Sequence, residues 1–251
     1  MDRRSILKSL AAAPLAAVLG RPELTRAAAS TLNVVATRTA QGADVKAAVA
    51  VPADPPRAAV LLVHEWWGLN NQIKVVATGL ARQGYLALAA DLFDGKVTTD
   101  RGTARLLTQS IDPDAALQTL VAWVQWLRAQ PGIKRVATLG WCFGGSWSLT
   151  VSTAVKVDAT VVYYGKVDKD PEQLAALNGP VLGHFASQDA WITRGMVSRF
   201  EAAMNRSGKA HTSYWYEADH AFANPTTARY DAGAAELAWS RTLEFLGKHL
   251  G

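Results

Sequence analysis

Eight short apolar runs constrain the fold of this 251-residue chain more than any other feature of its sequence. Each run has the length and the β-branched content of a strand, and they span residues 32–37, 45–51, 58–63, 85–90, 133–139, 159–164, 181–186 and 212–216. From the third run onward they alternate with helical patterns. Strands that lack a polar face and are separated by helices predict a mostly parallel sheet of eight strands with helices on both faces, hence an α/β fold.

The helical patterns are clearest at two places. Asp112 and Pro113 begin a run whose apolar residues recur at spacings of three and four, and Pro131 and Gly132 follow its end. A second such run closes the chain between Ala235 and Leu250. Because the carboxyl ends of parallel strands carry the working loops of such sheets, the loops at residues 64–68, 91–95, 140–145, 187–189 and 219–222 are the candidate site.

The first 29 residues predict an export signal rather than part of the fold. Arg3 and Arg4 precede an Ala-rich apolar run over residues 10–19, and three alanines at 27–29 form a small-residue cleavage site before Ser30. This pattern resembles bacterial twin-arginine signals. The run is interrupted by Pro14 and is shorter than the roughly 18 residues that a membrane span requires. We therefore expect a single mature domain over residues 30–251, periplasmic or secreted and without a membrane anchor; a Sec signal or an amphipathic N-terminal helix is the alternative.

Composition excludes several classes of protein. With 49% hydrophobic and 19% charged residues, a fully disordered chain is excluded. Five of the basic residues and only two acidic ones lie in the first 29 positions, so most of the net charge of +5 belongs to the signal. The remainder has no basic stripe interleaved with aromatic residues, so we expect no nucleic-acid partner. We also expect the protein to be a monomer. The single cysteine, Cys142, is either a buried small side chain or a reactive thiol.

The segment around Cys142 has the pattern of a nucleophile elbow. Gly140, Gly144 and Gly145 surround the cysteine between a strand that is predicted to end at Leu139 and a helix that is predicted to begin near Ser146. Small residues suit such a turn because its backbone is strained and the strand and helix approach closely. A Gly-rich turn with a buried cysteine is the structural alternative, and neither common phosphate-loop motif is present. The thiol is therefore the candidate nucleophile.

A thiol nucleophile needs a base and an acid that orients the base. Asp189 and His220 follow Cys142 in the chain order nucleophile, acid, histidine, and each lies just after a predicted strand. Asp219 adjoins His220 too closely to orient it. The other histidines compete poorly, because they lie before a loop glutamate, within or at the start of strands, or at the end of the last helix; they are His64, His184, His211 and His249.

The loop after the third predicted strand begins like a zinc motif but lacks its second histidine. His64 and Glu65 match the first two positions of H-E-x-x-H, whereas Gly68 occupies the last one, so we expect no metal. In α/β-hydrolases this loop instead donates a backbone N–H to the oxyanion, together with the residue after the nucleophile. Those donors are Trp66 and Phe143, and the chemistry requires no cofactor.

Together these segments resemble the dienelactone hydrolase (carboxymethylenebutenolidase) family over essentially all of the mature chain. The resemblance rests on Glu65, the Gly-x-Cys-x-Gly-Gly segment at 140–145, Tyr163-Tyr164-Gly165, Asp189 and His220-Ala221-Phe222. It implies an α/β-hydrolase fold in which Cys142 is the nucleophile, His220 the base and Asp189 its orienting acid. It also implies that Glu65 contacts the resting thiol and controls its ionisation.

The chain departs from the best-known members of this family at two positions. Where they hold the carboxylate of the substrate with arginines, this chain has Gly95 and Asn224, which disfavours dienelactone itself as substrate. Lys96 lies one place off and lacks the bidentate guanidinium. Tryptophans on the loops favour an apolar or aromatic acyl or lactone substrate, although lid or core packing also explains them. The expected pocket residues are Trp67, Trp141, Tyr164, Trp191, Phe222 and Asn224.

The sequence thus predicts a hydrolase that opens a small-molecule lactone or carboxylic ester through an acyl-thiol intermediate. A thioesterase or a peptidase-like hydrolase could use the same triad. A non-catalytic periplasmic protein that binds lactones or aromatic acids is the alternative from a different class, because binding does not require the triad.

Overall fold

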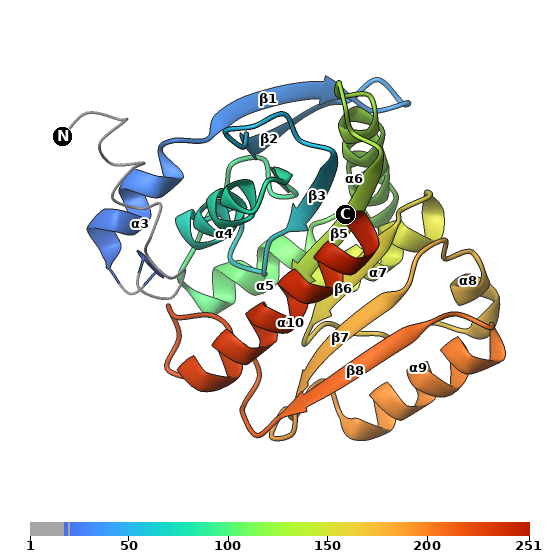
Figure 1. Cartoon of the computed structure of the whole chain (residues 1–251). Coiled ribbons are helices and arrows are strands. Elements are labelled where there is room, and N and C mark those ends of the chain that lie inside the picture. Colours follow the sequence, from blue (N-terminus) through green and yellow to red (C-terminus); the bar gives the residue numbers. More distant parts are fainter. Residues whose placement is uncertain (1–17, 20) are drawn as a thin grey trace.

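The computed structural model describes residues 18, 19 and 21–251 of the chain (Figure 1). The twin arginines and most of the predicted apolar run at 10–19 lie outside the described residues. The strands are β1 (Asn33–Arg38), β2 (Asp44–Ala50), β3 (Ala58–Val63), β4 (Leu86–Ala90), β5 (Arg135–Trp141), β6 (Ala159–Tyr163), β7 (Val181–Ala186) and β8 (His211–Tyr216). Every one of them overlaps a predicted run.

These strands form one sheet in the order β1-β2-β4-β3-β5-β6-β7-β8. The pairs β1–β2 and β2–β4 are antiparallel, and all the other neighbours are parallel. The predicted fold class, a mostly parallel eight-stranded sheet of the α/β-hydrolase type, is therefore confirmed. Parallel pairing aligns the carboxyl ends of β3, β5, β6, β7 and β8 at one edge of the sheet, so the loops that carry the candidate residues meet there.

Most of the described helices begin after a residue whose side chain caps the first turn. They are α3 (Pro22–Ala29), α4 (Asn71–Arg82), α5 (Arg101–Gln109), α6 (Pro113–Arg128), α7 (Phe143–Ala154), α8 (Pro171–Ala175), α9 (Arg194–Arg206) and α10 (Ala232–Leu250). In α6, the Asp112 side chain accepts hydrogen bonds from the first-turn amides of Asp114 and Ala115, and Pro113 occupies the first turn, as predicted. The predicted start of α7 near Ser146 is wrong: the helix begins at Phe143, directly after the cysteine.

The core is divided by the sheet into two layers. Successive residues of β3 point to opposite faces, so Leu62 packs with α4 and α10 while Leu61 packs with α6. A third apolar cluster packs α9 against β6 and β7. Figure 1 shows α10 crossing the front of the sheet.

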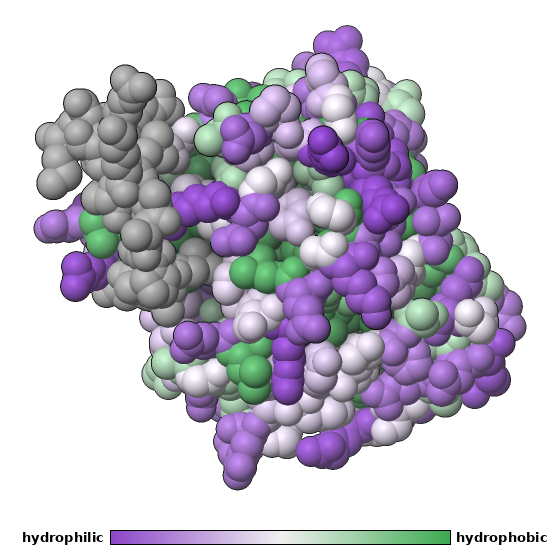
Figure 2. All heavy atoms as spheres, viewed as in Figure 1, coloured by the Kyte–Doolittle hydropathy of each residue, from purple (hydrophilic) through white to green (hydrophobic). Residues whose placement is uncertain are grey.

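The predicted cleavage segment lies in helix α3, which packs beside α4 (Figure 1). Ala28 and Ala29 are buried there with Val18 against Val75 of α4. Among the described residues, no helix combines the length and the apolar character that a membrane crossing needs. Figure 2 shows mostly hydrophilic residues on the face viewed, with the hydrophobic ones in separate patches.

Candidate active site

The nucleophile elbow forms between β5 and α7. Cys142 has φ of +52° and ψ of −117°, a backbone conformation that residues other than glycine rarely adopt. Its N–H donates to the Tyr163 carbonyl at 2.9 Å. A Cβ atom at Gly140 would overlap the carbonyl group of Gly144, and one at Gly144 would overlap the Val63 carbonyl. The glycines are thus required by close backbone approach, and the sharp turn presents the sulfur at the edge of the sheet.

The side chains of Cys142, His220 and Asp189 form a continuous chain of hydrogen bonds. The sulfur lies 3.1 Å from Nε2 of His220, and Nδ1 of His220 lies 2.6 Å from Oδ2 of Asp189. The three residues come from the loops after β5, β8 and β7, as the sequence predicted. Nδ1 donates to the carboxylate, which leaves Nε2 free to exchange a proton with the sulfur.

The charges of this chain are set by burial and hydrogen bonding together. Burial opposes ionisation of Asp189, yet hydrogen bonds from His220 and from the amides of Ile192 and Trp191 hold its pKa below the usual value. Burial likewise opposes protonation of His220, but its bonds with Asp189 and Cys142 raise its pKa. The raised pKa of His220 means that Nε2 readily accepts a proton, and such a base beside a thiol is the arrangement that activates a cysteine.

Glu65, at the start of the loop after β3, is buried next to the triad. The resemblance implied that its carboxyl group contacts the resting thiol. Instead, its hydrogen bonds come from the Asn224 amide and, at 3.4 Å, from the Tyr164 hydroxyl, while Cys142 pairs with His220. Burial raises the pKa of Glu65 to about 7, and these two donors and the charge of His220 oppose that rise only in part.

His64 has a structural role. Its Nδ1 donates to the Glu65 carbonyl at 2.6 Å and its Nε2 accepts from the Leu92 amide at 3.1 Å, so both ring nitrogens are used. Burial lowers the pKa of His64, which keeps the ring neutral. Within residues 18, 19 and 21–251, no group of three or more His, Cys, Asp and Glu side chains is arranged to hold a metal ion.

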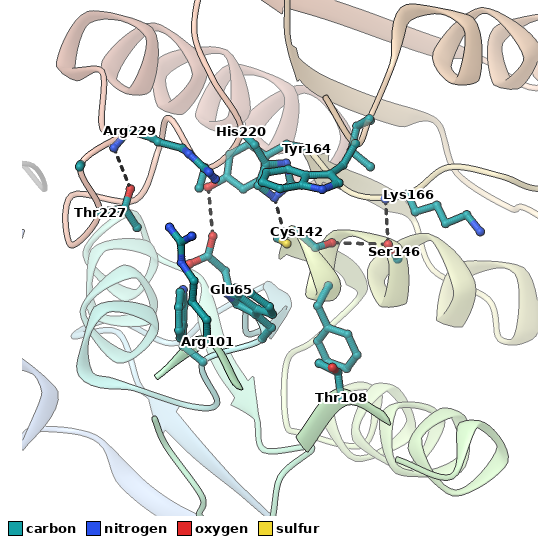
Figure 3. A pocket seen from close by; sticks show the side chains of 17 residues that line it. Glu65, Arg101, Thr108, Cys142, Ser146, Tyr164, Lys166, His220, Thr227 and Arg229 are labelled. Carbon is teal, nitrogen blue, oxygen red and sulfur yellow. Dashed lines mark hydrogen bonds between the residues drawn. The ribbon is translucent and has the colours of Figure 1, made fainter. Parts of the chain in front are cut away.

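A cavity of about 490 Å³ opens over the sulfur (Figure 3). Trp66 and Phe143 both line it, and Phe143 is the first residue of α7, whose first-turn N–H groups have no acceptor within the helix. The predicted oxyanion donors therefore border the same space as the Cys142 sulfur. The complete lining is Glu65, Trp66, Trp67, Arg101, Thr108, Cys142, Phe143, Ser146, Tyr164, Lys166, Trp191, Ile192, His220, Ala221, Thr227, Ala228 and Arg229.

Three of the six predicted pocket residues do line this cavity, namely Trp67, Tyr164 and Trp191. The assignments of Trp141, Phe222 and Asn224 to the pocket are wrong, because these side chains are buried beneath it. Trp141, at the end of β5, and Phe222 belong to the core layer that faces α4 and α10. The side-chain amide of Asn224 donates a hydrogen bond to the carboxyl group of Glu65.

Sequence reasoning missed the cations of the cavity. Arg101 begins α5, Lys166 follows Gly165 after β6, and Arg229 lies in the segment before α10. In the view of Figure 3, Arg101 and Arg229 lie on one side of Cys142 and Lys166 lies on the other. Lys96, one place off the position of the family's arginine, borders a different depression. Only Lys166 had a signal in the sequence, since it directly follows the Tyr163-Tyr164-Gly165 segment.

Comparisons with known proteins identify the family of this chain. The model of the dienelactone hydrolase family matches residues 45–250. Carboxymethylenebutenolidase of Pseudomonas putida is 28% identical over 211 residues, covering 80% of this chain and 89% of that protein. Carboxymethylenebutenolidase 1 of Cupriavidus pinatubonensis is 27% identical over 198 residues, covering 74% and 84% respectively. A crystal structure assigned as a dienelactone hydrolase from Klebsiella pneumoniae superposes with a TM-score of 0.77 at 26% identity, covering 87% of this chain and 99% of that one. The chain therefore belongs to the dienelactone hydrolase family and is a hydrolase of lactones or carboxylic esters.

Proposed function

We propose that this protein cleaves its lactone or ester with a Cys142–His220–Asp189 triad through an acyl-thiol intermediate. The observation that supports the proposal most strongly is the 3.1 Å contact between the Cys142 sulfur and Nε2 of His220, continued by the 2.6 Å contact between Nδ1 and Asp189. A nucleophile within hydrogen-bond reach of a base, which is in turn oriented by an acid, is the arrangement that covalent catalysis requires.

In the first half of the reaction the thiol proton moves to Nε2 of His220, and the sulfur attacks the carbonyl carbon of the substrate. The carbonyl oxygen becomes negatively charged and is bound by the backbone N–H groups of Phe143 and Trp66. Protonated His220 then gives its proton to the leaving oxygen as the C–O bond breaks. The acyl group remains on sulfur; for a lactone, the freed hydroxyl stays attached to that acyl group.

In the second half, His220 takes a proton from a water molecule, whose oxygen attacks the thioester carbon. The C–S bond breaks, the sulfur recovers a proton from His220, and the carboxylic acid leaves. Asp189 accepts a hydrogen bond from Nδ1 throughout and stabilises the imidazolium that forms in each half.

The lining of the cavity supports an aromatic substrate that carries a negative charge. Trp66 and Trp67 pack edge to face with ring centroids 4.8 Å apart, and Trp191 presents its ring 5.0 Å from that of His220. An aryl group can pack against such walls. The guanidinium group of Arg229 lies 4.9 Å over the Trp191 ring, and its Nε lies 3.3 Å from Oδ2 of Asp219. An anion attached to the aryl group would therefore meet the terminal nitrogens of the guanidinium.

Steady-state kinetics with chromogenic esters, lactones and thioesters test the mechanism. Cys142→Ala and His220→Ala should each lose on the order of a thousandfold or more in kcat, with little further loss when combined, because the two residues act as a unit. Cys142→Ser should also be poorly active, since a hydroxyl is harder to ionise than a thiol. Full turnover by Cys142→Ala would refute the covalent mechanism, and preference for thioesters would identify a thioesterase. A protein that only binds lactones would show no thiol-dependent turnover.

We also propose that residues 1–29 direct export through the twin-arginine route, which leaves the mature enzyme in the periplasm. The support is the sequence pattern of Arg3 and Arg4 ahead of a short apolar run and three alanines. Replacing both arginines by lysine should leave the precursor in the cytoplasm, whereas the unmodified chain should be recovered from the periplasm beginning near Ser30. Export that is unchanged by the double substitution would contradict the assignment.

A further inference from the structure

Asn224 is held in one orientation by its surroundings. Its Oδ1 accepts hydrogen bonds from the amide and the hydroxyl group of Thr226, at 2.9 and 2.7 Å. Its backbone N–H donates to the Ala221 carbonyl at 2.9 Å, and its side chain is completely buried. Because the oxygen of the amide is engaged by an N–H donor, the Nδ2 group must face the other way, where it donates to Oε2 of Glu65.

The second oxygen of Glu65 is also engaged by a neutral donor. Tyr164, directly after β6, donates from its hydroxyl to Oε1 at 3.4 Å, and its ring packs 5.1 Å from that of His220. No ion pair within residues 18, 19 and 21–251 involves Glu65. The ionisable groups that share the cavity with its carboxyl group are Arg101, Cys142, Tyr164, Lys166, His220 and Arg229.

These contacts give the carboxyl groups of Asp189 and Glu65, which both lie close to His220, different hydrogen-bond partners. Asp189 engages Nδ1 of His220, while Glu65 is directed toward Tyr164, which leaves the sulfur to His220 alone. We propose that Asn224 is a positioning residue that holds the Glu65 carboxyl group on Tyr164 and away from the Cys142 sulfur, so that the thiol is paired with His220 before any substrate binds. This inference rests on the proposed thiol mechanism.

The bond from Asn224 has two physical consequences for the thiol. It stabilises the carboxylate form of Glu65, and a negative charge near His220 favours the protonated imidazole that accompanies a reactive sulfur. It also removes the carboxyl group as a competing hydrogen-bond partner of the sulfur. Loss of the amide should therefore raise the pKa of Glu65 above about 7 and make the resting thiol less reactive at neutral pH.

The rate at which iodoacetamide alkylates Cys142 in the substrate-free protein tests this directly. Cys142 is the only cysteine of the chain, so incorporation reports on one site. Asn224→Leu, which keeps the approximate volume without the amide, should slow alkylation about tenfold at neutral pH and shift the pH profile upward, as expected for losing a hydrogen bond to a charged group. Asn178→Leu is the matched control, because the Asn178 amide donates to the Val157 carbonyl and Asn178 does not line the cavity. It should leave the profile unchanged.

A double variant separates positioning from structural damage. If Asn224 acts through Glu65, then Glu65→Gln with Asn224→Leu should be alkylated at the same rate as Glu65→Gln alone. Additive losses, or an Asn224→Leu profile identical to that of the unmodified protein, would overturn the proposal. If Asn224→Leu fails to fold, Thr226→Val keeps the amide but removes one donor to its oxygen. That variant should shift the profile in the same direction by a smaller amount, and no shift would overturn the proposal.

The two proposals fail in different ways. Turnover that persists in Cys142→Ala removes the thiol mechanism, whatever the alkylation profiles show. Turnover that depends on Cys142, together with an alkylation profile insensitive to Asn224, removes only the positioning role.

Discussion

The buried carboxyl group of Glu65 predicts that the stability of the protein depends on pH in an identifiable way. Burial raises its pKa to about 7 in the folded protein, against 4.5 for an ordinary glutamate. Between these pH values the folded state retains a proton that the unfolded chain has released, so the free energy of unfolding decreases as the pH rises through this window. A pKa unit corresponds to about 1.4 kcal/mol, and the full penalty above neutral pH is therefore about 3 kcal/mol.

Glu65→Gln replaces the titratable carboxyl group by a neutral amide, whose oxygen can still accept the hydrogen bond from Asn224. Relative to the unmodified protein, its free energy of unfolding should increase by about 2.5 kcal/mol between about pH 5 and about pH 8. Urea denaturation of both proteins at a series of pH values measures this difference, and contributions from other titrating groups largely cancel in it. Glu236→Gln, at an exposed position of α10, serves as the control. A difference that stays constant with pH, or that decreases as the pH rises, would refute the reasoning.

Three further predictions concern the elbow, the cavity and the triad. Gly140→Ala should destabilise the protein by about 3 kcal/mol or more in urea denaturation, because its Cβ would overlap the Gly144 carbonyl group. Gly247→Ala in α10, where a Cβ meets nothing within 4 Å, should be neutral or stabilising by about 0.5 kcal/mol, and equal effects at the two sites would contradict the steric argument. Arg229→Gln should raise KM about tenfold for an aryl ester that carries a carboxylate and leave KM for its neutral methyl ester unchanged; a parallel change for both esters would contradict charge recognition. Asp189→Asn should lower kcat by on the order of a hundredfold or more, yet less than Cys142→Ala does, because the base survives and only its orientation and tautomer suffer; activity equal to that of the unmodified enzyme would exclude Asp189 as the orienting acid.

The fold was predictable because its signals are local. The alternation of short apolar runs with amphipathic segments marks every strand, and the cap at Asp112 with Pro113 marks the start of α6. Boundaries at the elbow were less predictable. The turn between β5 and α7 consists of Cys142, which has the strained backbone conformation. As a result, β5 continues to Trp141 instead of ending at Leu139, and α7 begins at Phe143 instead of near Ser146.

The grouping of Cys142, Asp189 and His220 was predictable from chain order and strand ends, but the walls of the cavity were not. Trp141 is the last residue of β5 and is buried in the core layer, whereas Cys142 lies in the strained turn that follows and borders the cavity. Sequence position alone does not carry this distinction. Arg101 and Arg229 come from segments with no motif, and only the folded chain brings them to the same cavity.

The proposed mechanism requires an acyl group on the Cys142 sulfur during turnover. Mass spectrometry of enzyme quenched in acid during turnover of a slowly hydrolysed aryl ester tests this most directly. One acyl adduct per chain is expected, located on the peptide that contains Cys142, absent from Cys142→Ala and prevented by prior alkylation with iodoacetamide. Continued turnover without any adduct, or with full activity after complete alkylation of Cys142, would contradict it.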